Sequence, residues 1–171
     1  MRFRAILLAS FVAALAAGCV GYRVGPTNGA IAGDKSIQVH FFRNLTREPR
    51  LTEAVTISLR RQLQQDGTYQ LATDGTADIV VTGAISKYER SGLSFQPGDI
   101  QTVRDFTISI IARVSATERG TGKKILSDHE VEGRTTVRAG TDLASAERQA
   151  VPLMAEDLAR RVTALLVEGD W

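Results

Sequence analysis

DFTISIIARVSAT, at residues 105–117, has the clearest alternation of apolar and polar residues in the chain. Every second residue from Phe106 to Ala116 is apolar, and all the residues between them except Ile111 are polar. Successive side chains of a β-strand point to opposite faces, so this alternation predicts a strand with one buried and one solvated face. Sheets with one solvated face are commonly antiparallel, and we therefore expect a mostly antiparallel sheet.

The sequence on either side of this stretch supplies the neighbouring strands. A turn is predicted at residues 119–122, and in the strand that follows it Ile125, Val131 and Val137 share one face. The other face of that strand is charged, with Asp128, Glu130, Glu132, Arg134 and Arg138. Upstream, the pattern predicts further strands at residues 36–42, 69–73 and 77–88.

Two amphipathic helices complete the pattern. The first has Pro49 at its first position, ends at residues 66–67, and is marked by an apolar stripe of Leu51, Val55, Leu59 and Leu63. The second is capped by Asp142, and its stripe consists of Met154, Leu158, Val162, Leu165 and Leu166. Pro152 lies inside the second helix and should kink it or separate its first turns.

These elements predict the fold class. Their order is β-α-β-β-β-β-α, and each helix has a single apolar stripe that must be buried on the apolar face of the sheet. We therefore expect an α/β (α+β) domain in the form of a two-layer sandwich, with a mostly antiparallel sheet and two helices packed on one face.

The first 18 residues predict a signal peptide that is removed. Arg2 and Arg4 precede an apolar run at residues 5–17, which is too short to cross a hydrocarbon core of about 30 Å as a helix. Small residues then lead to Cys19, and this end of the run is similar to a lipobox. Leu15 stands one position earlier than the leucine of the usual lipobox.

Cys19 is the predicted lipidation site. It is the only cysteine of the chain, and an unpaired thiol in an oxidising compartment is a liability that acylation removes. The alternative is an ordinary secretory signal that leaves Cys19 as a thiol. Val20 favours the outer membrane, where acyl chains such as palmitate would anchor the protein. The glycine-rich residues 19–35 would then form the lipidated N-terminus and a flexible tether, ahead of a domain at residues 36–171.

The charge balance argues against a nucleic-acid-binding protein. Without the two arginines of the signal, the 21 Lys and Arg fall to 19, which equals the 19 Asp and Glu. Binding to nucleic acid requires a broad basic field. We expect no nucleic-acid partner.

No constellation of catalytic or metal-binding residues is found in the sequence, which contains no C-x-x-C, H-E-x-x-H or G-x-S-x-G motif. His129 is predicted to be buried on the apolar side of its strand and His40 to be solvated. Glu130 and Glu132 could serve in acid–base chemistry, but they continue a row of charges typical of a solvated face. We expect a non-enzymatic protein without cofactor or metal.

Three motifs resemble those of the LptE family of lipopolysaccharide-assembly lipoproteins. They are the cysteine-to-GY opening at residues 19–22, the F-x-N-x-T-x-E-P-x-L junction at residues 42–51, and the A-D-x-x-(apolar)-x-G-x-I-x-x-Y strand at residues 77–88. The resemblance extends from residue 19 to about residue 168 and would make residues 36–171 an LptE-like domain. It implies that the protein sits as a plug inside a large outer-membrane β-barrel, LptD. The protein would help this barrel to assemble and to deliver lipopolysaccharide. A polar sheet face suits that task, because the interior of a large barrel is polar.

Lipopolysaccharide contact would require cations that pair with lipid phosphates. Lys87, Arg90 and Arg104 flank a predicted loop that also contains apolar residues, and they are the candidate lipopolysaccharide-binding residues. A solvated loop with incidental charges is the alternative.

A different class of function is compatible with the same residues. A small α/β domain on a tether also suits an outer-membrane lipoprotein that faces the periplasm and activates a cell-wall enzyme or pilots a secretion pore. Whether the domain is enclosed in a barrel distinguishes this class from the LptE-like function.

Overall fold

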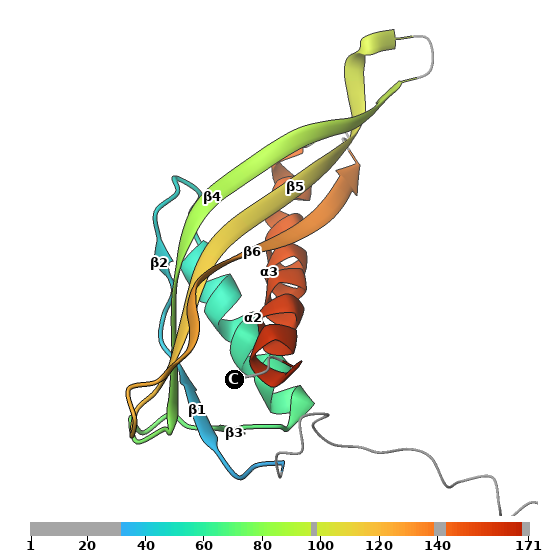
Figure 1. Cartoon of the computed structure of the whole chain (residues 1–171). Coiled ribbons are helices and arrows are strands. Elements are labelled where there is room, and N and C mark those ends of the chain that lie inside the picture. Colours follow the sequence, from blue (N-terminus) through green and yellow to red (C-terminus); the bar gives the residue numbers. More distant parts are fainter. Residues whose placement is uncertain (1–31, 97–98, 139–142, 169–171) are drawn as a thin grey trace, which may run out of the picture.

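The computed structural model describes residues 32–96, 99–138 and 143–168 (Figure 1). Within them the chain forms helices α2 (Leu51–Asp66) and α3 (Leu143–Glu168). The strands are β1 (Ser36–Val39), β2 (Arg43–Asn44), β3 (Gln70–Leu71), β4 (Ile79–Gln96), β5 (Asp99–Glu118) and β6 (Lys124–Arg138). Both helices pack on one face of the sheet, so the predicted two-layer sandwich is confirmed.

The sheet is mixed, with its long strands antiparallel. Its order is β3-β1-β4-β5-β6, and β2 pairs with β4 beyond the end of β1. The pairs β4–β5 and β5–β6 are antiparallel, whereas β1, β2 and β3 pair in parallel. The alternation at residues 105–117 therefore predicted an interior strand of the sheet, and the short strands β1, β2 and β3 depart from the antiparallel pattern.

The core lies between the sheet and the two helices. The apolar face of β5 is completely buried at Ile108, Ile110, Ala112, Val114 and Ala116. The predicted stripe of α2 is buried along its whole length, and in α3 Met154, Leu158, Val162 and Leu166 are buried while Leu165 is partly buried. At Gly133 the main chain of α3 comes so close that an added Cβ would lie 2.4 Å from the carbonyl oxygen of Met154.

The predicted strand at residues 36–42 is divided into β1 and β2. Phe42 turns into the core, where it is 1% exposed, and its backbone N–H donates to Thr56 Oγ1 at 3.3 Å instead of continuing a ladder. Its ring lies over Gly83, where an added Cβ would come within 2.3 Å of it. The residue beside Phe42 in sequence, Phe41, is 65% exposed.

Helix α2 differs from the prediction at Pro49, whereas at Pro152 the structure excludes only the predicted separation of the first turns of α3. Helix α2 begins at Leu51, not at Pro49, because Arg50 adopts a left-handed conformation with φ 68° and serves as the N-cap. Helix α3 is continuous through Pro152. The predicted cap at Asp142 lies outside the described residues. In the described part of the chain, neither helix has the length and apolar character required to span a membrane.

The predicted loop after residue 88 is part of a hairpin instead. Strand β4 continues to Gln96 and β5 begins at Asp99, so the two strands form an arm that extends past the last residue of β6 (Figure 1). Their register runs on through Ser91↔Thr107 and Gly92↔Phe106, with irregularities nearer the tip. The ends of these strands were predicted from the apolar pattern, but backbone pairing continues the strands past the residues that show this pattern.

His129 is exposed, so its predicted burial is wrong. It pairs with Val114 and lies on the helix side of β6, as expected. However, β6 is the edge strand, and beside Arg161 and Leu165 of α3 a hollow of about 550 Å³ remains open. His40 is exposed, as predicted.

Candidate functional site

The face of the sheet turned away from the helices is a polar surface, which we call the open face. Arg43, Ala84, Arg113 and Glu130 lie in one row across β2, β4, β5 and β6. The charges in this row are partly paired, with Arg113 Nε 3.9 Å from Glu130 Oε2. Exposed polar residues of neighbouring rows are Thr82, Lys87, Glu89, Glu132 and Arg134. The open face offers many polar groups to a partner and no catalytic grouping among the described residues.

The predicted lipopolysaccharide-binding cations do not form a single cluster. Lys87 lies on the open face, with its Nζ 3.9 Å from Glu89 Oε1. Arg90 lies on the opposite side of the same strand, where it forms an ion pair with Glu147 of α3 and stacks over the Phe106 ring at 5.6 Å. The side chain of Arg104 lies outside the described residues. The odd spacing of three residues along a strand places Lys87 and Arg90 on different faces.

The junction between β2 and α2 is held by side-chain hydrogen bonds. Asn44 Nδ2 donates to the carbonyl oxygen of Glu48 at 2.7 Å, and Asn44 Oδ1 accepts from the backbone N–H and the hydroxyl of Thr46 at 2.9 and 2.8 Å. The Thr46 hydroxyl oxygen accepts in turn from the N–H of Glu48 at 3.2 Å. The N-x-T-x-E part of the junction motif thus forms a folded turn, in which the Asn and Thr side chains bond to the nearby backbone.

Asn44→Ala tests this turn. The substitution removes one donor and the acceptor of two hydrogen bonds, and we expect the free energy of unfolding to fall by about 1–3 kcal/mol in urea denaturation. Asn44→Asp keeps the acceptor and loses the donor, so its loss should be smaller. Equal stability of Asn44→Ala and the unsubstituted protein would contradict a structural role of the turn.

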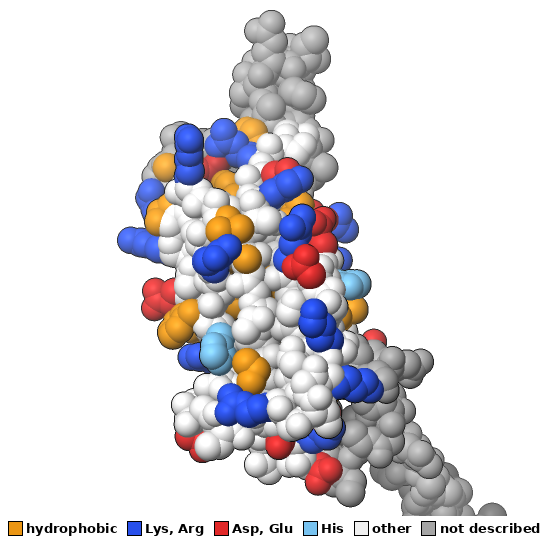
Figure 2. Space-filling view, turned by 60° about the vertical axis from the view of Figure 1, so that its left-hand side comes forward, with side chains coloured by type: hydrophobic (Ala, Val, Ile, Leu, Met, Phe, Trp, Pro, Cys, Tyr) orange, Lys and Arg blue, Asp and Glu red, His pale blue; other side chains and the backbone are white. Residues whose placement is uncertain are grey.

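The edge of the sheet at β1 and β2 is covered by a side chain of α2. Arg60 Nη2 donates to the carbonyl oxygen of Val39 at 2.7 Å, and the guanidinium lies 5.1 Å from the centroid of the Phe41 ring. Figure 2 brings this edge forward and shows Lys and Arg side chains among hydrophobic ones. At the other edge, Asp157 of α3 accepts a hydrogen bond from the backbone N–H of Arg134 at 3.0 Å. Each helix therefore satisfies an edge backbone group that could otherwise pair with another chain.

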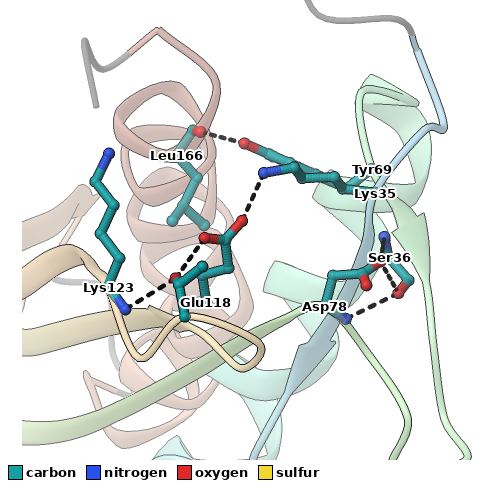
Figure 3. A network of polar contacts seen from close by, with 8 residues as sticks. Lys35, Ser36, Tyr69, Asp78, Glu118, Lys123 and Leu166 are labelled. Atoms are coloured by element: carbon teal, nitrogen blue, oxygen red, sulfur yellow. Dashed lines mark hydrogen bonds and ion pairs between the residues drawn. The ribbon is translucent and has the colours of Figure 1, made fainter.

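The first described residues are tied to the sheet by polar contacts, which we call the entry network (Figure 3). Lys35 Nζ lies 2.7 Å from Glu118 Oε1. The backbone N–H and the hydroxyl of Ser36 donate to Asp78 Oδ2 at 2.8 and 2.6 Å. Nearby, the Tyr69 hydroxyl donates to the carbonyl oxygen of Leu166 at 2.8 Å. The chain therefore enters the domain at a fixed point, beside the last turn of α3.

A groove of about 510 Å³ lies between the helices. Its apolar lining includes Ala54, Ile57 and Val151, and charged residues such as Arg61 and Glu156 stand at its sides. In the described part of the chain, no group of three or more His, Cys, Asp or Glu residues could hold a metal ion.

Comparison with known proteins gives the family. Residues 35–166 match the family model LptE, described as lipopolysaccharide-assembly. The chain belongs to the LptE family. The match begins at Lys35 in the entry network and ends at Leu166, so it includes nearly all the described residues. No curated protein matches the chain in a sequence search.

Solved structures share the fold of this LptE-family chain at low sequence identity. The hypothetical protein CT253 from Chlamydia trachomatis is similar with a TM-score of 0.54 and 12% identity, over 78% of this chain and 95% of that one. A minor lipoprotein from Acinetobacter baumannii is similar with a TM-score of 0.51 and 14% identity, over 78% and 93% of the two chains. At these identities the likeness concerns the fold alone.

The entry network makes the stability of this LptE-family domain dependent on pH. Hydrogen bonds from Ser36 lower the pKa of Asp78, and the hydrogen bond from Lys35 lowers the pKa of Glu118. A carboxyl whose pKa is lowered by folding stabilises the fold above its unfolded pKa, and that contribution is lost as the pH falls through the folded pKa. We expect the free energy of unfolding to be nearly constant down to about pH 5 and to decrease below about pH 4.

Urea denaturation at a series of pH values measures this dependence. In the double variant Asp78→Asn, Glu118→Gln, stability at neutral pH should be lower and the decrease below about pH 4 less steep. Glu53→Gln, which changes an exposed carboxyl of α2 outside the entry network, serves as the control with which the acid slope of the double variant is compared. The same acid slope in the double variant and the unsubstituted protein would contradict the prediction.

Proposed function

We propose that this protein is a non-catalytic outer-membrane lipoprotein, anchored through Cys19, that plugs an LptD-type β-barrel and helps it to assemble and to deliver lipopolysaccharide. The observation that carries the proposal is the match to the lipopolysaccharide-assembly family over residues 35–166. The sequence before the domain supports the anchor, because a lipobox-like run ends at Cys19 and a glycine-rich stretch follows it.

The open face is the surface proposed to meet the barrel. The interior of a large outer-membrane barrel is polar. The row Arg43, Arg113 and Glu130 offers charges of both signs to such a wall. The helix-covered side of the sheet is occupied by the core and cannot serve this purpose.

The first test is affinity purification of the tagged, lipidated protein from detergent-solubilised outer membranes. A stoichiometric large β-barrel among the co-purified proteins is the expected result. If the protein is recovered with a cell-wall enzyme or a secretion pore, the proposal is wrong and a periplasm-facing role is supported instead. Recovery of the protein without any partner would also overturn the proposal.

A photo-crosslinking amino acid then tests which surface meets the barrel. Arg113→p-benzoylphenylalanine places the crosslinker on the open face, and we expect a crosslink to the barrel. Gln64→p-benzoylphenylalanine, at an exposed position of α2, is the matched control and should crosslink less. A stronger crosslink from the position in α2 would overturn the assignment of the open face.

The anchor is tested separately by Cys19→Ala. Mass spectrometry of the unsubstituted protein should find acyl chains on Cys19, and the variant should be lost from the outer-membrane fraction. An unmodified thiol on a cleaved protein would support the ordinary secretory signal instead.

We further propose that lipopolysaccharide phosphates are contacted by cations of the hairpin, with Lys87, Arg90 and Arg104 as candidates. Glu147 already neutralises Arg90, so charge reversal there would change packing as well as charge. Lys87→Glu and Arg104→Glu are the more direct tests. Unchanged lipopolysaccharide binding in both variants would exclude these two residues.

A further inference from the structure

The margin of the open face along β1, β2 and the segment after them carries exposed apolar side chains between arginines. Phe41 is 65% exposed and Leu45 is 56% exposed. The exposed residues Arg43 and Arg47 alternate with them along the chain. We call these four residues the edge strip, and Figure 2 shows the side of the molecule on which cations and hydrophobic side chains lie together. Aromatic side chains and arginine are both enriched in protein interfaces relative to the rest of the surface.

The edge strip is continuous with the open face. Phe42 is buried in the core, so Phe41 and Arg43 on either side of it in sequence point outward. Arg43 is also part of the row of residues that crosses the open face. Beyond β2, the N–H of Leu45 donates to the carbonyl oxygen of Ile85 at 2.9 Å and keeps the chain beside β4. The strip therefore lies on the surface that we propose meets the barrel.

Contacts within the domain hold the strip in place before any partner binds. Arg60 Nη2 donates to the carbonyl oxygen of Val39, and its guanidinium lies against the Phe41 ring. The hydrogen bonds of the Asn44 turn order the backbone that follows β2. Side chains that stand on an ordered backbone lose less conformational freedom when they bind, so the strip is suited to tight association.

The charge of the strip is positive. Residues 40–50 contain Arg43, Arg47 and Arg50 and a single acidic residue, Glu48. In the described part of the chain, neither Arg43 nor Arg47 forms an ion pair with a carboxylate within 4.0 Å. A partner that covers the strip must therefore supply anionic groups, because burying an unpaired cation is costly.

We propose that the edge strip anchors the protein on a stretch of the barrel wall where carboxylates pair with Arg43 and Arg47 around apolar hollows for Phe41 and Leu45. Guanidinium groups bind carboxylates through two parallel hydrogen bonds, which fixes position as well as charge. The lumen wall of a large barrel is otherwise polar, so apolar protrusions fit it only where it offers apolar surface. The proposal rests on the proposed function for its partner, and it adds the place and the chemistry of the strongest contact.

Photo-crosslinking from the strip tests the partner and its chemistry. In the lipidated protein, Phe41→p-benzoylphenylalanine replaces one exposed aromatic side chain by another. We expect a crosslink to the barrel, and mass spectrometry should place it on a lumen-facing segment that carries Asp or Glu beside apolar residues. A crosslink to lipid, to another protein or to a second copy of this chain would overturn the proposal. Absence of a crosslink, or a barrel segment without acidic residues, would overturn it as well.

Two double variants measure how much the strip contributes to binding. Each tagged variant is produced beside an untagged, unsubstituted copy, which keeps the barrel assembled and competes for it. Arg43→Glu, Arg47→Glu should lower the amount of barrel that co-purifies with the tagged protein by at least about tenfold, because the reversed charges repel the carboxylates of the wall. Phe41→Ser, Leu45→Ser should also lower it by about tenfold or more, because the apolar anchors are lost.

The matched controls lie on the helices. Arg61→Glu, Arg148→Glu reverses two exposed arginines, and Ile57→Ser, Leu153→Ser changes two apolar residues that are 45% and 50% exposed. Both control variants should co-purify nearly as much barrel as the unsubstituted protein. Circular dichroism verifies that every variant is folded. Equal losses of barrel in the strip variants and the control variants would overturn the proposal.

Failure of this proposal is distinguishable from failure of the proposed function. If the tagged, unsubstituted protein co-purifies no barrel, the proposed function is wrong and the proposed anchor is wrong with it. If it co-purifies the barrel and the strip variants do so equally well, the proposed function stands and only the edge strip is excluded as the anchor.

Discussion

Gly133→Ala is expected to lower the free energy of unfolding by about 3 kcal/mol or more, a large part of the 5–15 kcal/mol typical of a domain. A Cβ at this position of β6 would lie 2.4 Å from the carbonyl oxygen of Met154 and 2.7 Å from the backbone nitrogen of Leu158. Both atoms belong to the main chain of α3, which cannot rotate aside as a flexible side chain can. The helix would have to move off the sheet and would uncover core residues on both elements.

Gly120→Ala is the matched control. Nothing lies within 4 Å of a Cβ added at Gly120, in the turn between β5 and β6, and the change in the free energy of unfolding should stay within about 0.5 kcal/mol. Urea denaturation of both variants provides the comparison. If the two midpoints agree with that of the unsubstituted protein, α3 does not sit directly on the backbone of β6.

The centre of the fold was predictable because local pattern and tertiary environment agree there. The alternation in β5 and the four-residue repeat of α2 each describe one apolar surface, and in the structure both surfaces belong to the same buried core. A two-layer arrangement follows from that condition alone. The parallel pairing of β1 and β3 does not follow from the apolar pattern, because strands this short carry no pattern that specifies whether they pair in parallel.

The departures from the prediction occur where a distant element decides the outcome. His129 lies on the expected side of β6, but its burial depends on whether α3 covers that part of β6. The length of the β4–β5 hairpin depends on backbone pairing, which side-chain periodicity does not report. Arg50 adopts a left-handed conformation ahead of α2, a conformation that is unusual for a residue other than glycine.

The candidate site was predictable in its chemistry and less so in its geometry. The polar character of the open face follows from the alternation in β5 and β6. The ion pairing of individual cations does not follow from this alternation, because Arg90 pairs with Glu147, 57 residues further along the chain. Lys87 and Arg90 appeared to flank a loop and instead lie on opposite faces of a strand, because the strand extends past both.

Phe42→Ala is expected to lower the free energy of unfolding by about 3–5 kcal/mol, the usual cost of removing a buried phenylalanine side chain. Phe42 is 1% exposed, and its ring fills the space above Gly83. Phe41→Ala, at the neighbouring and 65% exposed residue, is the control and should cost less than about 1 kcal/mol through loss of the contact with Arg60. If the free energy of unfolding falls by a similar amount in the two variants, Phe42 is not the only one of the two phenylalanines that is buried in the core.

A double-mutant cycle with Gly83→Ala then isolates the contact between the two motif residues. In the unsubstituted background an added Cβ at Gly83 would lie 2.3 Å from Phe42 Cε1, so Gly83→Ala alone should be strongly destabilising. After Phe42→Ala the ring is gone, and the same Cβ would fill part of the cavity. We therefore expect the double variant to be more stable than the sum of the single effects predicts, by about 1 kcal/mol or more. If the effects of the two substitutions on the free energy of unfolding are strictly additive, Phe42 and Gly83 do not interact. Coupling would explain why the phenylalanine of the junction motif and the glycine of the following strand motif occur in one chain, since each occupies space that the other leaves.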